Sequence, residues 1–357
     1  MNKNRVALDF PVPPADFTGT ETSPTVKRRR DERIDIVKGI AMFLIVSIHT
    51  EVFGKIGTPY PVIAVPLFFF LSGFYDNTHQ PFRTWFPRSF LSLFVTGVIW
   101  VLITFAFTKT LTYIKDGSFT VSATWEDPLV AGKVTWFLFA LFYAKLLTAA
   151  VHCTHLLKPM LWVSLVAAAL VSRYDLPLLL DEGISALPFY LAGKLAYPHI
   201  KKWIQHKALV IVSLLSFALM PQAWFPYLLV SYDSDKPVFL YPLAFLVSIL
   251  SFVFFLWLGT NLRRCTWLAN FGKESLGVML IHPILLHTTA VVLNRLFVPG
   301  STPWIALFLL AYFAVCFLCY HLSVLCKRYC PILLGSTRRG ATVVASGSAK
   351  LFRRYGA

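Results

Sequence analysis

Long apolar stretches almost free of charge constrain this chain more than any other feature. Windows such as 91–108 and 238–260 contain no Asp, Glu, Lys or Arg. Overall, 57% of the 357 residues are hydrophobic and only 14% are charged, whereas soluble domains are about 45–50% apolar and about 25% charged. Intrinsic disorder requires low hydrophobicity. The sequence therefore excludes a soluble enzyme and a disordered chain, and it indicates a polytopic membrane protein.

About ten segments are long or apolar enough to be membrane helices. The fifth to seventh of these are short, with proline within or beside each one. Short or broken helices are tolerated in a membrane where they face protein or a cavity rather than lipid. The predicted segments are 34–53, 59–75, 86–108, 134–151, 160–172, 183–197, 208–221, 238–259, 275–297 and 303–325. The fold class is thus an all-α bundle of about ten transmembrane helices.

Lysine and arginine predict the orientation of this bundle. With the N-terminus in the cytosol, 23 of the 33 basic residues fall in inner segments and 7 in outer ones, as the positive-inside rule requires. Both termini are therefore expected in the cytosol. The domain prediction is a disordered basic tail over 1–30, a transmembrane domain over 31–325 and a second basic tail over 326–357. We read the net charge of +16 as a topology signal, and we expect no nucleic-acid partner.

Ionisable residues inside apolar spans are costly and are functional candidates by default. The first span carries Asp35, Lys38 and His49. Eleven residues separate Lys38 from His49, so on a helix they lie within about 20° of one another and about 16 Å apart. Asp35 lies on nearly the same face. The alternative is that Asp35 and Lys38 are interfacial anchors and that His49 packs at the outer interface.

Other polar positions are weaker candidates. Arg88 begins the third span, where it could be a positive-inside anchor or bind an anion. Trp136 lies near the predicted outer interface, where aromatic residues commonly form a belt. Lys194 lies within a span and requires a partner, and His282 lies mid-span before a proline. We expect His287, His321 and the four cysteines of the last span to be structural, with no metal site.

The order of several short motifs resembles the membrane-bound acyltransferase 3 family. These motifs are RIDIVKGIAM followed by His49, VPLFFFLSGF at 65–74, WFL at 136–138, LPFYLAG at 187–193, and FGKESLG at 271–277 followed by His282. The Asp35-x-x-Lys38-Gly39 form is most similar to the fucose 4-O-acetylase-like branch, which includes exopolysaccharide O-acetyltransferases. The resemblance covers residues 31–325.

The resemblance implies a bacterial inner-membrane enzyme that acylates sugars of exopolysaccharide, capsule or lipopolysaccharide. The family's essential histidine corresponds to His49, and its basic residues correspond to Lys38 and Arg88. Asp35, Lys38 and Arg88 are therefore expected to bind the acyl donor. Trp136, Ser275 and His282 correspond more loosely to substrate-site positions.

The predicted activity is O-acyl transfer, with His49 as general base. We expect acetyl-CoA as cosubstrate, no bound cofactor, a carbohydrate or lipid-linked glycan as acceptor, and the lipid bilayer as the remaining partner. A transporter or exporter of a sugar lipid or small anion is the alternative, because it also explains buried charges. It does not explain a polar stripe that ends in a histidine. The third hypothesis is a purely structural membrane scaffold.

Overall fold

The computed structural model describes residues 31–50, 63–116, 135–152, 156–171, 174, 176–219 and 240–336. These residues form helices and connecting turns without any strand. The helices are α1 (Glu32–Ile48), α3 (Ala64–Gly73), α4 (Phe82–Ser89), the π-helix η1 (Phe90–Val95), α5 (Thr96–Asp116), α7 (Trp136–His152), α8 (Leu157–Val171), α9 (Leu180–Ala196), α10 (Ile200–Gln205), α11 (Lys207–Ala218), α12 (Leu240–Asn261), α13 (Thr266–Lys273), α14 (Ser275–Leu296) and α15 (Thr302–Tyr329). Three short 3₁₀ turns complete the set: η3 (Pro177–Leu179), η4 (Tyr197–His199) and η6 (Pro331–Leu334).

Four helical stretches of the described chain are long and apolar enough to cross a membrane. They are Phe82–Leu111, Tyr241–Asn261, Ser275–Leu296 and Thr302–Tyr329. Shorter apolar helices are α3, α7, α8 and α11. The chain is therefore an all-α, multi-pass membrane protein. Each predicted span overlaps a helix of the described residues, while the number of about ten crossings stays a prediction.

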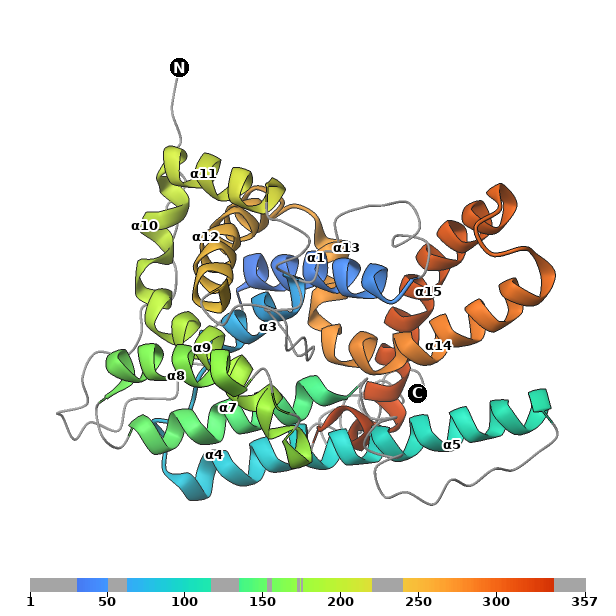
Figure 1. Ribbon diagram of the computed structural model, residues 1–357, viewed down its shortest axis with the longest axis horizontal. Helices are drawn as coiled ribbons and strands as arrows, with labels where there is room; N and C mark the ends of the chain where they lie inside the picture. The colour runs from blue at the N-terminus through green and yellow to red at the C-terminus, as the bar shows by residue number, and fades with distance from the viewer. Residues whose placement is uncertain are drawn as a thin grey trace, which may run out of the picture.

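The α1 helix lies at the centre of the bundle, with α3, α12, α13 and α14 around it (Figure 1). Its packing face is almost entirely apolar, and Ile36, Val37, Ala41 and Met42 are fully buried. Burial of this face, rather than helix propensity, stabilises such a helix. The polar residues of α1 therefore lie on a helix that other helices surround on several sides.

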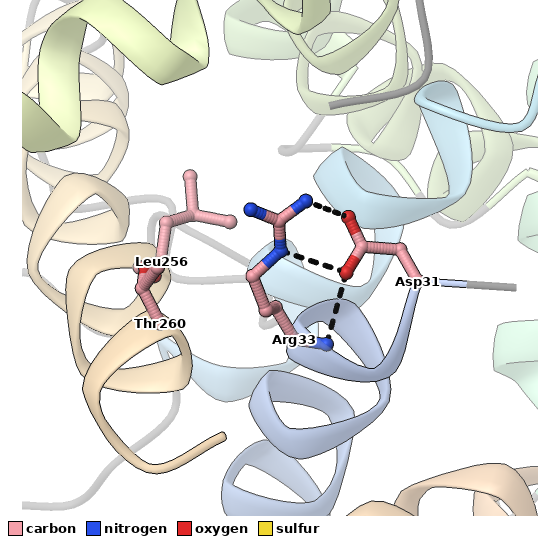
Figure 2. A network of polar contacts seen from close by, with 4 residues as sticks. All are labelled: Asp31, Arg33, Leu256 and Thr260. Carbon is pink, nitrogen blue, oxygen red and sulfur yellow. Dashed lines mark hydrogen bonds and ion pairs between the residues drawn. The ribbon is translucent and has the colours of Figure 1, made fainter. Parts of the chain in front are cut away.

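Asp31 and Arg33 fix the beginning of α1. The Asp31 carboxylate accepts a hydrogen bond from the backbone N–H of Arg33 at 3.0 Å, which caps the helix. The Arg33 guanidinium donates to both oxygens of the same carboxylate at 2.9 Å. Figure 2 shows the guanidinium between Asp31 and the α12 residues Leu256 and Thr260. This ion pair therefore lies where α1 faces α12.

Glycines bring two pairs of helices into backbone contact. A Cβ added at Gly272 would collide with the carbonyl oxygen of Asp35, which shows how closely α13 packs on α1. A Cβ added at Gly193 would collide with the carbonyl oxygen of Phe70, where α9 crosses α3. Small residues permit such close approach between membrane helices. Both crossings lie within the sequence motifs that resemble the acyltransferase 3 family.

The C-terminal end of the described chain folds back onto the bundle. The α15 helix passes residue 325, the predicted end of the transmembrane domain, and ends at Tyr329. The following η6 turn is held by the Trp100 indole N–H, which donates to the Leu333 carbonyl at 2.7 Å. Leu334 is buried. The predicted tail at 1–30 and the part of the predicted 326–357 tail beyond residue 336 lie outside the described residues.

Candidate active site

His49 lies at the C-terminal end of α1. The helix ends at Ile48, and His49 has φ −83° and ψ 1°, with its backbone N–H turned to the Ser47 carbonyl. The Thr50 hydroxyl donates to the same carbonyl at 2.6 Å. The Thr50 backbone N–H donates to this carbonyl as well, at 3.0 Å, and α1 ends before the predicted limit at residue 53. His49 as a whole residue is exposed, although most of α1 is buried, and one side of its ring packs against protein.

His282 of α14 lies beside His49. The two ring centroids are 5.0 Å apart and the rings are inclined by 50°. His282 is only 2% exposed, and its Nδ1 lies 2.9 Å from the Val278 carbonyl oxygen. A carbonyl can only accept, so Nδ1 carries the proton and Nε2 has a free lone pair. Within the described part of the chain, Nε2 has no hydrogen-bond partner. The fold therefore pairs an accessible imidazole with a buried one.

The other two candidate residues of the first span, Lys38 and Asp35, have different neighbours. The Lys38 ammonium lies 5.1 Å from the centre of the Tyr75 ring, just after α3. Asp35 is 2% exposed, at the close contact between α1 and α13. The spacing predicts that Lys38 and His49 lie on one face of a helix, about 16 Å apart; in the structure Lys38 lies beside Tyr75 and His49 beside His282. They belong to two groups of polar residues, one at each end of α1.

Asp76 forms a polar network at the Lys38 end. Its carboxylate pairs with the Lys194 ammonium of α9 at 2.8 Å and accepts hydrogen bonds from the hydroxyls of Tyr190 at 2.7 Å and Thr78 at 2.8 Å. Burial favours the protonated carboxyl, but the charge of Lys194 and these hydrogen bonds outweigh it and hold the pKa of Asp76 below its ordinary value. Asp76 is therefore the partner that the sequence required for Lys194.

The remaining predicted site residues lie apart from this network. Arg88 is exposed on α4, and it forms no hydrogen bond or ion pair with any described residue. Trp136 begins α7 and packs on Phe69 of α3, with ring centroids 6.0 Å apart. Ser275 begins α14. No contact among the described residues joins Arg88 to Lys38 or Asp35, which were predicted to share a donor site with it.

A pocket of about 540 Å³ lies on a different face of α1 from the predicted stripe. It is lined by Phe43, by α13 and by the α15 residues from Phe313 to His321. Its lining is mostly aromatic, and neither histidine of the 49–282 pair contributes to it. Across the described ranges, no group of three or more His, Cys, Asp or Glu side chains could hold a metal ion. The histidine pair and the Asp76 network therefore lie outside this pocket.

Comparison with known proteins gives one match. A family described as an acyltransferase domain, that of acyltransferase 3, matches residues 31–324. The matched range contains both histidines and the whole Asp76 network. No curated protein and no solved structure matches the chain.

Proposed function

Because the chain belongs to the acyltransferase 3 family, we propose that this membrane acyltransferase moves an acetyl group from acetyl-CoA to a carbohydrate hydroxyl. The acceptor is a sugar of an exopolysaccharide, a capsule or a lipopolysaccharide precursor, as in the fucose 4-O-acetylase-like branch. The enzyme works in the bacterial inner membrane, takes its donor from the cytosol and needs no bound cofactor. The family match favours group transfer over transport.

The observation that carries the proposal is the pair of His49 and His282. An accessible imidazole at a helix end can meet a substrate hydroxyl, and imidazole gains and loses a proton near neutral pH. His282, with a free lone pair on Nε2, can accept a hydrogen bond from the His49 ring. That hydrogen bond would fix which nitrogen of His49 faces the substrate, as in other base–orienter pairs.

The reaction then needs two proton movements at His49. The imidazole takes the proton from the sugar hydroxyl while the oxygen attacks the thioester carbonyl. The carbon–sulfur bond breaks as the ester forms, and the imidazolium returns its proton to the CoA thiolate. A positioned general base of this kind contributes about 10²–10⁴-fold to the rate.

The donor would approach from the other end of α1. Acetyl-CoA carries several phosphate charges, and Lys38 lies nearer the predicted cytosolic end of α1 than His49, on the face that the helical spacing predicts for both. The narrow pantetheine arm can then extend along α1 and bring the thioester to the histidine pair. Trp136 and Ser275 are the remaining substrate-site proposals.

The test is His49→Asn, which keeps a hydrogen-bonding group but removes the base. We expect normal membrane abundance and acetyl-CoA binding, with glycan acetylation lowered about 10²–10⁴-fold. His287→Asn is the matched control, because His287 is an exposed histidine of α14, and it should retain activity. An active His49→Asn enzyme would place the base elsewhere, and loss of donor binding would make His49 a binding residue.

A further inference from the structure

A groove of about 500 Å³ is lined by residues of α8, α9, α10, α11 and α12. Its α12 wall extends from Phe245 to Val253, about 12 Å of helix. Two of the lining residues, Trp162 of α8 and Leu246 of α12, are 63% and 53% exposed. The groove therefore opens to the outside of the bundle. Since α12 is long and apolar enough to cross a membrane, this side of the bundle faces lipid chains rather than water.

His199 and Trp203 give this groove a polar end. Every lining residue is apolar or aromatic except His199, whose ring stacks on that of Trp203 with centroids 6.4 Å apart and planes inclined by 23°. Both residues lie between the predicted spans 183–197 and 208–221, on the predicted cytosolic side, where α10 joins α9 to α11 at one edge of the bundle (Figure 1). Tryptophan is enriched at the level of the lipid headgroups. The polar end of the groove thus lies at the predicted cytosolic interface.

Two exposed lysines flank the groove, one on α10 and one on α8. Lys202 lies three residues after His199, and Lys158 lies three and four residues before the lining residues Leu161 and Trp162. Residues at these spacings are neighbours on a helix surface. Neither lysine forms a hydrogen bond or ion pair with any described residue, and α8, η4, α10, α11 and α12 contain no Asp or Glu. The apolar groove is therefore flanked by two positive charges that no carboxylate of these elements balances.

We propose that this groove binds an anionic phospholipid of the cytosolic leaflet, with an acyl chain along α12 and the phosphate held by Lys202 and Lys158. Basic pockets between membrane helices on the cytosolic side bind anionic headgroups. His199 can donate a hydrogen bond to the same phosphate. A zwitterionic lipid has the same chains but no net charge, so the two lysines select the anionic lipid. The site contains none of the residues assigned to acyl transfer, and it is independent of the proposed function.

The first test is native mass spectrometry of the detergent-purified full-length protein with equal amounts of dioleoyl-phosphatidylglycerol and dioleoyl-phosphatidylcholine. The protein should retain phosphatidylglycerol preferentially, and Lys202→Gln or Lys158→Gln should each weaken its binding about fivefold. Lys201→Gln is the matched control and should bind normally, because Lys201 is an exposed lysine of α10 that lies three or four residues from no lining residue.

Three results of this test would overturn the proposal. One is equal retention of the two lipids, and another is unchanged binding of phosphatidylglycerol by Lys202→Gln. The third is an equal loss in Lys201→Gln and Lys202→Gln, because the lipid would then respond to the basic surface in general and not to the groove.

A second pair of variants tests the apolar part of the groove without changing any charge. Leu246 and Leu243 are both exposed leucines of α12, but only Leu246 lines the groove. Leu246→Trp should fill part of the groove and weaken phosphatidylglycerol binding about tenfold, the effect of expelling about two CH₂ groups of the acyl chain. Leu243→Trp should bind as the unmodified protein does. Equal binding by the two variants would overturn the proposal, because the acyl chain would then lie elsewhere.

Discussion

At the scale of single residues, the two histidines differ in what they can do. His49 ends a helix and is accessible, whereas His282 is enclosed in α14 with one nitrogen held by a backbone carbonyl. A buried polar nitrogen without a hydrogen-bond partner lowers the stability of the fold, so each such nitrogen needs a structural or functional explanation. In this geometry, Nε2 of His282 can accept a hydrogen bond from the His49 ring. We therefore propose that His282 positions His49.

This role predicts the behaviour of His282→Phe, which keeps an aromatic ring in the buried site and removes both nitrogens. Acetyl transfer should fall about tenfold to a hundredfold, because His49 would no longer be held in one tautomer. Acetyl-CoA affinity should be unchanged. The measurements are the acetylation rate and donor binding at equal membrane abundance.

His287→Phe on the same helix is the control for His282→Phe. It should be as active as the unmodified enzyme, because His287 is exposed. Full activity of His282→Phe would show that the histidine contact has no role in catalysis. An equal loss in both variants would point to a general effect of phenylalanine on α14.

Sequence reasoning identified residues here but not their pairing. His49 and His282 could both be singled out as ionisable groups in apolar spans, and Lys194 as a lysine in need of a partner. Asp76 could not be named, because it follows a helix in a turn and belongs to no periodic pattern. The groove beside His199 could not be predicted either. Its lining comes from several separate elements, and these are brought together only by the fold.

At the scale of elements, helix positions follow from hydropathy, but helix crossings depend on particular glycines. The apolar runs predict α12 and α14 within two residues at each end. They do not predict that Gly73 and Gly193 bring α3 and α9 into backbone contact. That crossing places Asp76 beside Lys194 and Tyr190, so the polar network depends on it.

Gly193→Ala tests this crossing. The added methyl group would collide with the carbonyl of Phe70, and backbone cannot move aside as a side-chain end can. Overpacking of this kind costs about 1–3 kcal/mol, so the thermal unfolding temperature in detergent should fall clearly.

Gly97→Ala on α5 is the matched control. Its added methyl group would meet the end of the Phe139 ring at 2.9 Å, a side-chain contact that can relax more than a backbone collision. Alanine also favours a helix over glycine by up to about 1 kcal/mol. The unfolding temperature should therefore fall less than in Gly193→Ala. If Gly193→Ala proved as stable as Gly97→Ala, the close packing of α3 on α9 would be refuted.

At the scale of the whole molecule, the predicted orientation rests on charge. Basic residues divide 23 to 7 between the predicted inner and outer segments, and the bilayer and insertion machinery respond to this bias. The donor path depends on it, because Lys38 faces cytosolic acetyl-CoA only if the end of α1 nearest it is inside. Reversal of the bundle would expose Lys38 to a compartment without CoA.

The two ends of α15 test the orientation most directly. Val298 precedes this helix and is 75% exposed, and Cys330 follows it and is exposed. With the other five cysteines replaced by alanine, Val298→Cys should react with a membrane-impermeant thiol reagent in intact cells. Cys330 should react only after the membrane is permeabilised, because α15 is long and apolar enough to cross the bilayer. Labelling of Cys330 in intact cells would reverse the orientation, and with it the cytosolic donor site.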